Sequence, residues 1–211
     1  MQYCKKCLTT NLRPNSSIDN NGICIACNYS SITSKKSFLS NLDTLISMIQ
    51  RNKVRRKKHP IYDCIVGVSG GKDSTRQAHW VRDRLGLNPL LVCCGYPPLQ
   101  MTDIGADNMS NLISMGFDIE VFTPAPQSSA KLSLSSFIKF GNVCKSAEMA
   151  LFSSVPRIAI SKKIPLIFWG ENPALQVGDS KVEGVNYFDG KNLRNLNTLM
   201  DGGVEWIFDN I

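Results

Sequence analysis

From residue 61 onward, short apolar segments alternate with longer segments in which apolar residues recur every three or four positions. The short segments predict β-strands and the longer ones predict amphipathic helices, because side chains alternate between faces in a strand and share a face at helical spacing. Strands that alternate with helices are typical of a parallel sheet with helices on both faces, so we expect an α/β fold. The predicted strands span residues 61–68, 89–94, 118–122 and 165–169.

Glycine, proline and capping residues set the expected ends of the helices. The helix after the first strand should stop at Gly86, and the next should run from a Thr102 cap to about residue 115. Between the third and fourth strands we predict one helix near residues 134–140 and others within 145–163. The last of these is expected to begin near Pro156, because the fixed φ of proline suits a first helical turn.

The first 34 residues are polar and carry two Cys-x-x-Cys pairs, Cys4 with Cys7 and Cys24 with Cys27. So short a polar segment cannot bury an apolar core. Thiolates at positions i and i+3 of a tight turn can bind one ion, and two such turns complete the tetrahedral shell that Zn2+ prefers. We predict a zinc ribbon over residues 1–34 with a structural Zn2+, because four cysteines leave no open coordination position. A disulfide or an iron–sulfur cluster is the alternative.

Residues 35–59 form the expected helical, basic connector to the α/β domain, which we place at residues 60–211. Apolar residues at helical spacing predict a helix over residues 37–52 that ends in the basic run. We interpret this run as a solvated helix end and expect no nucleic-acid partner, although such a run also suits RNA or an anionic substrate. It accounts for most of the net charge of +7 and consists of Arg51, Lys53, Arg55, Arg56, Lys57 and Lys58.

Composition restricts the class of protein. A chain of 211 residues with 43% hydrophobic content can bury one core of ordinary size beside a small module. No apolar run reaches the roughly 20 residues that span a bilayer, and the first residues lack the apolar stretch of a signal peptide. We therefore expect a cytoplasmic protein with no membrane contact and with reduced cysteines. We also expect the core to contain the aromatic residues Phe38, Phe137, Trp169 and Trp206.

The turn after the first predicted strand reads Ser-Gly-Gly-Lys-Asp-Ser, residues 69–74, and leads into a helix. Gly70 and Gly71 allow the backbone to approach a ligand closely and to adopt conformations that other residues avoid, so several amide N–H groups can converge on phosphate oxygens. The helix N-terminus adds a positive dipole, and the Ser69 and Ser74 hydroxyls add donors. The pattern predicts a phosphate-binding loop, although a plain glycine turn before a helix would share it.

Asp73 lies within this loop, where a phosphate would repel its carboxylate. A Mg2+ ion between Asp73 and a bound pyrophosphate would remove that conflict, so we predict Asp73 as a magnesium ligand. The loop is not a Walker loop, because the spacing of four residues between Gly and Gly-Lys-Ser/Thr is absent, and it is not a dinucleotide fingerprint.

Residues 69–74 resemble the signature loop of the PP-loop, or N-type, ATP pyrophosphatases, the superfamily of GMP synthetase, asparagine synthetase and tRNA sulfur-transferring enzymes. The resemblance implies an adenine nucleotide alpha hydrolase-like fold that cleaves ATP to AMP and pyrophosphate. An oxygen of the substrate is adenylated, and ammonia or a sulfur nucleophile then displaces AMP. It further implies that Lys72 and Asp73 are catalytic and that ATP is bound by Ser69, Gly70, Gly71, Lys72, Asp73 and Ser74.

Further segments, spread over nearly the whole chain, resemble the N-acetyl sugar amidotransferases of bacterial surface polysaccharide biosynthesis. These enzymes convert an acetamido group of a sugar into an acetamidino group, which implies a role in lipopolysaccharide O-antigen or nonulosonic acid synthesis. Family members usually continue well beyond this length, so we expect the α/β domain to be incomplete at its C-terminus. The segments are residues 3–7, 13–14, 62–65, 88–92, 156–160 and 170–172.

The family mechanism requires a substrate site and a source of ammonia. Glu171 and Asn172 follow the fourth strand and would face the same crevice as the loop, because ligands of such sheets bind beyond the carboxyl ends of the strands. We expect Glu171 to be catalytic and Asn172 to bind the ligand, although this turn could simply cap the next element. Gln2 stands where an N-terminal nucleophilic cysteine would follow Met1, so we expect a separate glutaminase subunit to supply the ammonia.

Two other functions fit the same residues. A tRNA thiolase of the same superfamily would use Cys93, Cys94 and Cys144 for a persulfide or a cluster. Cys93 and Cys94 lie in an apolar strand, however, where buried structural cysteine is the commoner state. The other alternative is a scaffold that binds nucleotide without turnover, and an intact Asp73 weighs against it.

Overall fold

The computed structural model describes residues 1–12, 16–32, 42–51, 61–96, 102–170, 199 and 202–211. The chain divides into two compact units, and each is described by itself. One unit comprises Met1–Ile46 with Glu171–Trp206, and the other comprises Ser47–Gly170 with Ile207–Ile211. The predicted domain boundaries at residues 34 and 59 lie outside the described residues, so they stay predictions.

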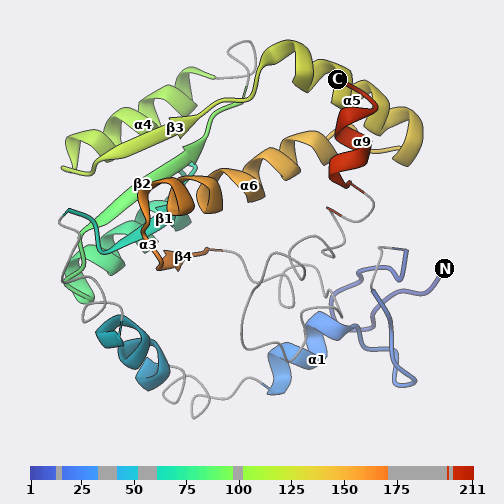
Figure 1. Ribbon diagram of the computed structural model, residues 1–211. Coiled ribbons are helices and arrows are strands. Elements are labelled where there is room, and N and C mark those ends of the chain that lie inside the picture. The colour runs from blue at the N-terminus through green and yellow to red at the C-terminus, as the bar shows by residue number, and fades with distance from the viewer. Residues whose placement is uncertain (13–15, 33–41, 52–60, 97–101, 171–198, 200–201) are drawn as a thin grey trace. The chain divides into compact units, whose positions relative to one another are not determined.

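The second unit contains a four-stranded parallel sheet in the order β3-β2-β1-β4 (Figure 1). The sequence predicts all four strands in the right places, although β1 and β4 are shorter than predicted. In β1 and β2, apolar residues do not alternate with polar ones, because both faces of these strands are buried. The strands are β1, Cys64–Gly67; β2, Pro89–Cys94; β3, Ile119–Phe122; and β4, Ile167–Phe168.

Helices cover both faces of the sheet, as predicted. The helix α6, Lys145–Lys162, contacts β1, β2 and β4, and its residues Val155 and Ile158 pack in one core cluster with Ile65 of β1. The side chains of Cys64 and Val66 point to the opposite face and are fully buried there. The helix α3, Lys72–His79, contacts β1 as well. The sheet is thus the middle layer of three.

The helices beside β2 begin and end close to the predicted positions. α3 continues as a π-helix, η1, Trp80–Arg84, and the chain then turns at Gly86 with φ +60°. The helix α4, Asp103–Ser114, is capped by Thr102, whose Oγ1 accepts a hydrogen bond from the Gly105 N–H at 3.1 Å.

The helices between β3 and β4 differ from the prediction. The prediction that a helix begins near Pro156 is wrong, because α6 is continuous and Pro156 lies inside it. Proline has no N–H to donate to the carbonyl four residues earlier, so it normally ends or kinks a helix. Packing of α6 on the sheet holds the residues on both sides of Pro156 in one helix. The proline at a first helical turn is Pro126, which begins the helix α5, Pro126–Phe140.

The first unit contains the helix α1, Ile25–Ile32, and two isolated antiparallel bridges, Tyr3 with Thr10 and Ile18 with Cys24.

Residues 42–51 are helical, which confirms the described part of the predicted connector helix. The remainder of that helix and of the basic run lies outside the described residues. A short helix, α9, spans Val204–Phe208. Among the described residues, none of the helices has both the length and the apolar character needed to cross a bilayer.

Candidate functional site

The four cysteines of the two Cys-x-x-Cys pairs converge on one point. Their sulfur atoms all lie within 4.8 Å of one another. The Cys4 and Cys27 sulfurs are 4.0 Å apart, and those of Cys7 and Cys24 are 3.6 Å apart. A tetrahedral ion with metal–sulfur bonds of about 2.3 Å needs sulfur–sulfur distances of about 3.8 Å. The donor set therefore fits a single tetrahedral metal ion.

Backbone hydrogen bonds hold the two cysteine turns in this geometry. The N–H groups of Lys6 and Cys24 point at the Cys4 sulfur at 3.4 and 3.3 Å. Asp19 organises the second turn, because its carboxylate accepts the N–H groups of Asn21 and Ile23, each at 2.9 Å. These bonds and the amide of Asn28 lower the pKa of Asp19.

The pKa values of the cysteines differ within the cluster. Burial opposes ionisation of Cys4, but the backbone N–H groups of Cys24, Cys7 and Lys6 outweigh it and lower the pKa of Cys4 to about 6. Burial and the neighbouring thiols raise the pKa of Cys27 to about 12. Four thiolates cannot coexist here without a cation, so metal binding would displace protons from the cluster.

The predicted phosphate loop connects β1 to α3. Val68 still pairs with the sheet through its N–H and the Val92 carbonyl at 2.9 Å, and α3 begins at Lys72. Gly70 has φ +76°, a conformation that favours glycine. Gly71 has φ −70° and ψ 165°, so the expectation that both glycines need special conformations is wrong for Gly71. Gly71 is instead the N-cap of α3 and provides no side-chain cap.

Side-chain hydroxyl groups form hydrogen bonds with the backbone of this loop. Ser74 Oγ accepts the Ser69 N–H at 3.3 Å and donates to the Gly71 carbonyl at 3.1 Å. Thr75 Oγ1 donates to the Gly70 carbonyl at 3.4 Å. Ser74 would have to exchange its bond to Gly71 before it could donate to a phosphate. The sequence pattern did not point to Thr75. A hydroxyl residue directly after the loop is nevertheless a signal for a hydrogen bond back to the loop backbone.

Backbone donors at the start of α3 are open to a ligand. In the described part of the chain, the N–H groups of Lys72, Asp73 and Ser74 have no protein acceptor, as expected for the first turn of a helix. Lys72 and Asp73 are exposed to solvent. An anion at this point would meet several N–H groups and the positive end of the helix dipole.

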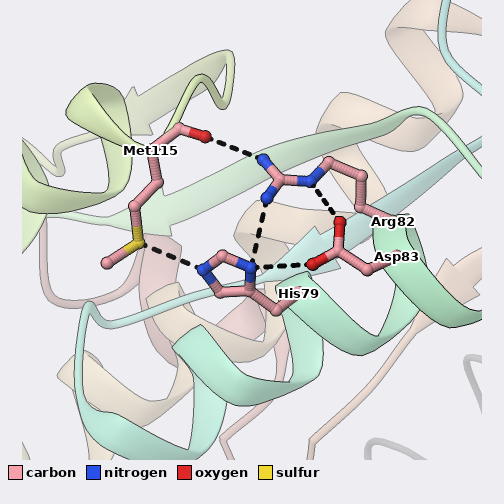
Figure 2. Close-up of polar contacts among 4 residues, drawn as sticks. All are labelled: His79, Arg82, Asp83 and Met115. Atoms are coloured by element: carbon pink, nitrogen blue, oxygen red, sulfur yellow. Dashed lines mark hydrogen bonds and ion pairs between the residues drawn. The ribbon is translucent and has the colours of Figure 1, made fainter.

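The last residue of α3 and the following η1 contact the end of α4 (Figure 2). The Arg82 Nη1 donates to the Met115 carbonyl at 2.8 Å, and its Nε donates to Asp83 Oδ1 at 2.8 Å. His79 Nε2 lies 3.2 Å from the sulfur of Met115. The Arg82 guanidinium also stacks 4.2 Å from the centre of the Phe117 ring.

The loop lies where the strand order reverses. β2 and β3 follow β1 on one side, and β4 pairs with β1 on the other. In sheets of this kind, ligands bind at the carboxyl ends of the strands on either side of this switch point. Gly170 follows β4, and a Cβ on Gly170 would lie 3.1 Å from Gln77 Oε1 of α3. Among the described residues this buried Oε1 has no hydrogen-bond donor, and sequence reasoning missed it.

The other predicted site residues are less informative. Glu171 and Asn172 lie outside the described residues, so their roles stay predictions. Cys93 and Cys94 are buried as expected, and burial raises their pKa, that of Cys94 to about 11. Cys144 is exposed at the N-cap of α6.

Comparison with known proteins finds solved structures of low sequence identity. No protein-family model matches, and no curated protein matches. One similar structure is NMN synthetase from Francisella tularensis, with 14% identity and a TM-score of 0.43 over 63% of this chain and 53% of that chain. Another is a predicted subunit of tRNA methyltransferase from Methanocaldococcus jannaschii, with 18% identity and a TM-score of 0.41 over 71% and 73% of the two chains.

A third similar structure is the U34-tRNA thiolase NcsA from Methanococcus maripaludis with its 4Fe-4S cluster, with 15% identity and a TM-score of 0.43 over 99% of this chain and 71% of that chain. The similarity to the NMN synthetase covers 53% of that protein, so this chain spans about half of its length. The strand order and the position of the glycine loop are those of an open parallel α/β sheet with a switch point beside β1. The four-cysteine module precedes it in the chain.

Proposed function

We propose that this chain binds ATP at the loop of residues 69–74 and cleaves it to AMP and pyrophosphate. The observation that supports this most is the set of open N–H groups at Lys72, Asp73 and Ser74, at the switch point of a parallel sheet. A pyrophosphate leaving group carries charge that these donors and the Lys72 ammonium would stabilise as it develops.

Asp73 fits a magnesium site, because its carboxylate is exposed in the first turn of α3 beside the phosphate donors. Phosphate oxygens and water would complete the coordination that Mg2+ prefers. Bound there, Mg2+ would neutralise part of the charge of the pyrophosphate. Asp73 would hold the ion, while the hydroxyls of Ser74 and Thr75 hydrogen-bond within the loop.

The substrate in this proposal is an acetamido sugar. Its amide oxygen would attack the alpha phosphorus with loss of pyrophosphate, ammonia would add to the carbon that carries the adenylated oxygen, and that oxygen would leave with AMP to give an acetamidino group. Glu171 and Asn172 would orient the sugar or the ammonia, which a separate glutaminase subunit would supply. The support for this substrate is the sequence resemblance to N-acetyl sugar amidotransferases.

A structural Zn2+ in the cysteine cluster is part of the proposal, supported by the sulfur–sulfur distances. A cluster in which each cysteine binds a different iron would hold the sulfurs farther apart. The buried Cys93 and Cys94, with their raised pKa values, also argue against a thiolase that uses them as nucleophiles.

The test is incubation of the chain with ATP, Mg2+, ammonium and a panel of acetamido sugars, followed by measurement of AMP, pyrophosphate and an amidine product. Sugar-dependent formation of all three is expected. Binding of ATP without turnover with any sugar would favour the scaffold alternative, and sulfur transfer to tRNA would favour the thiolase.

A further inference from the structure

Asn108 of α4 contacts the loop of residues 69–74. A Cβ placed on Gly70 would lie 2.7 Å from the Asn108 Cβ, closer than such carbons approach one another in folded proteins, so the contact depends on a glycine at position 70. α4 connects the parallel strands β2 and β3, and its first turns therefore lie toward the carboxyl ends of the strands. The loop lies at the same edge of the sheet, where ligands of such folds bind.

The carboxamide of Asn108 is open to a ligand. Within the part of the chain that the structure describes, this carboxamide forms no hydrogen bond, and solvent reaches its amide atoms. The side chain as a whole is partly exposed. An asparagine amide offers two N–H donors and one carbonyl acceptor. α4 therefore adds free donors to a loop that already presents open backbone N–H groups.

These two sets of donors lie within reach of one phosphate group. The open backbone N–H groups begin at Lys72, two residues after Gly70, and two residues of chain span at most about 7 Å. Donors on opposite sides of a phosphate can lie about 7 Å apart when each hydrogen bond is about 2.9 Å long. A phosphate on the N–H groups of α3 could thus also accept a hydrogen bond from Asn108.

Packing against Gly70 does not account for the amide. The atoms of Asn108 that lie closest to Gly70 are its Cβ and its backbone carbonyl, which every residue except glycine supplies. Alanine would make the same contact and is the better helix former. The carboxamide extends beyond this contact, so its donors remain available to a bound anion.

We propose that the Asn108 carboxamide donates a hydrogen bond to the pyrophosphate part of the nucleotide bound at the loop of residues 69–74. The inference rests on the proposed function, in which ATP binds at this loop. Ionised phosphate oxygens only accept hydrogen bonds, so Asn108 would present Nδ2 to them. α4 then forms a second wall of the phosphate site, opposite the N-terminus of α3.

The test compares two substitutions of Asn108 with a control on the same helix. Asn108→Ala keeps the Cβ that contacts Gly70 and removes only the carboxamide. Asn108→Asp keeps the size of the side chain but replaces the donors with a carboxylate. Asn111→Asp is the matched control, because Asn111 is an exposed asparagine of α4. The probes are ATP and inorganic pyrophosphate, each with Mg2+, and calorimetry measures their binding.

Asn108→Ala should weaken the binding of ATP and of pyrophosphate by the same factor, about 10-fold, because each loses one hydrogen bond to a charged group. Asn108→Asp should weaken both further, because its carboxylate repels the phosphate. Asn111→Asp should bind both probes as the wild type does. Thermal unfolding of Asn108→Ala should match that of the wild type, which separates ligand binding from a structural role.

Contrary outcomes distinguish this proposal from the proposed function. Equal affinity of the wild type and both Asn108 variants for pyrophosphate would overturn the proposal, as would a loss confined to ATP, which would place Asn108 at the nucleoside. Equal losses in Asn108→Asp and Asn111→Asp would reduce the effect to net charge and overturn it as well. A wild-type chain that binds neither probe would overturn both proposals. Pyrophosphate binding without turnover of ATP with any acetamido sugar would count against the proposed function alone.

Discussion

Gly70 packs directly against Asn108 of α4. A Cβ placed on Gly70 would lie 2.7 Å from the Asn108 Cβ and 3.2 Å from its carbonyl carbon, and Gly70 also has φ +76°. Two independent constraints, one steric and one conformational, therefore require glycine at this position. The contact also holds the loop of residues 69–74 against a second helix.

Gly70→Ala should destabilise the α/β domain by about 1–3 kcal/mol and reduce pyrophosphate release strongly, because the backbone must change conformation or α4 must move. Gly71→Ala is the matched control. The φ of Gly71 is −70°, and a Cβ added to Gly71 would lie 3.5 Å from the closest atom, Ser69 Oγ. Thermal unfolding and ATP turnover measure both effects. Equal destabilisation by the two substitutions would contradict the geometry described for the loop.

Asp73→Asn should leave the fold intact, because the side chain is exposed, and should lower pyrophosphate release by roughly 100-fold. The loss should be accompanied by a higher Mg2+ concentration at half-maximal rate, because a neutral amide binds the ion less tightly. Asp103→Asn, in the first turn of α4, is the control for removal of an exposed carboxylate. An unchanged Mg2+ dependence in Asp73→Asn would exclude Asp73 as the ligand.

Cys24→Ser should abolish metal binding and unfold the N-terminal module, because metal–thiolate bonding contributes on the order of 10 kcal/mol to the folding of such modules. Metal analysis of the purified chain should find one Zn2+ per wild-type chain and much less in the variant. Cys144→Ser is the control, since Cys144 is exposed and lies outside the cluster. Iron and sulfide in the wild-type protein would show that the four cysteines hold an iron–sulfur cluster and not Zn2+.

The α/β domain should lose stability as the pH rises from about 9 to about 11. Burial raises the pKa of Cys94 from 9.0 to about 11, so the folded state holds this proton more tightly than the unfolded state. The stabilisation that this proton gives is therefore fully present below the pKa of the unfolded state, 9.0, and is lost as the pH rises through the pKa of the folded state, about 11. Burial raises the pKa of Cys93 and of Tyr62 in the same direction.

Chemical denaturation at a series of pH values measures this effect. Cys94→Ala should be less stable at neutral pH, because it leaves a small cavity, but should have a flatter dependence on pH between 9 and about 11. Cys144→Ser is the control and should show the wild-type slope. A slope in Cys94→Ala as steep as that of the wild type would assign the alkaline loss to other groups.

Local patterns in the sequence predict most of the fold of the larger unit. The four strands and the capped start of α4 follow from apolar runs and a Thr102 cap, which act over a few residues. The position of Pro156 inside α6 does not follow from local preference, because packing against the sheet outweighs the backbone preference of proline. The expectation that Phe137 lies in the core is wrong, because its side chain is 57% exposed. This exposure depends in the same way on which face of α5 meets α6.

The sequence by itself determined the two motifs, the four cysteines and the glycine loop, because each depends on residue types at fixed short spacing. Only the tertiary structure showed that Gly70 rather than Gly71 has the special conformation, that Asn108 confines it, and that Gln77 lies beside Gly170. These relationships join residues distant in the chain, and they arise from packing of the helices on the sheet, which no local pattern records.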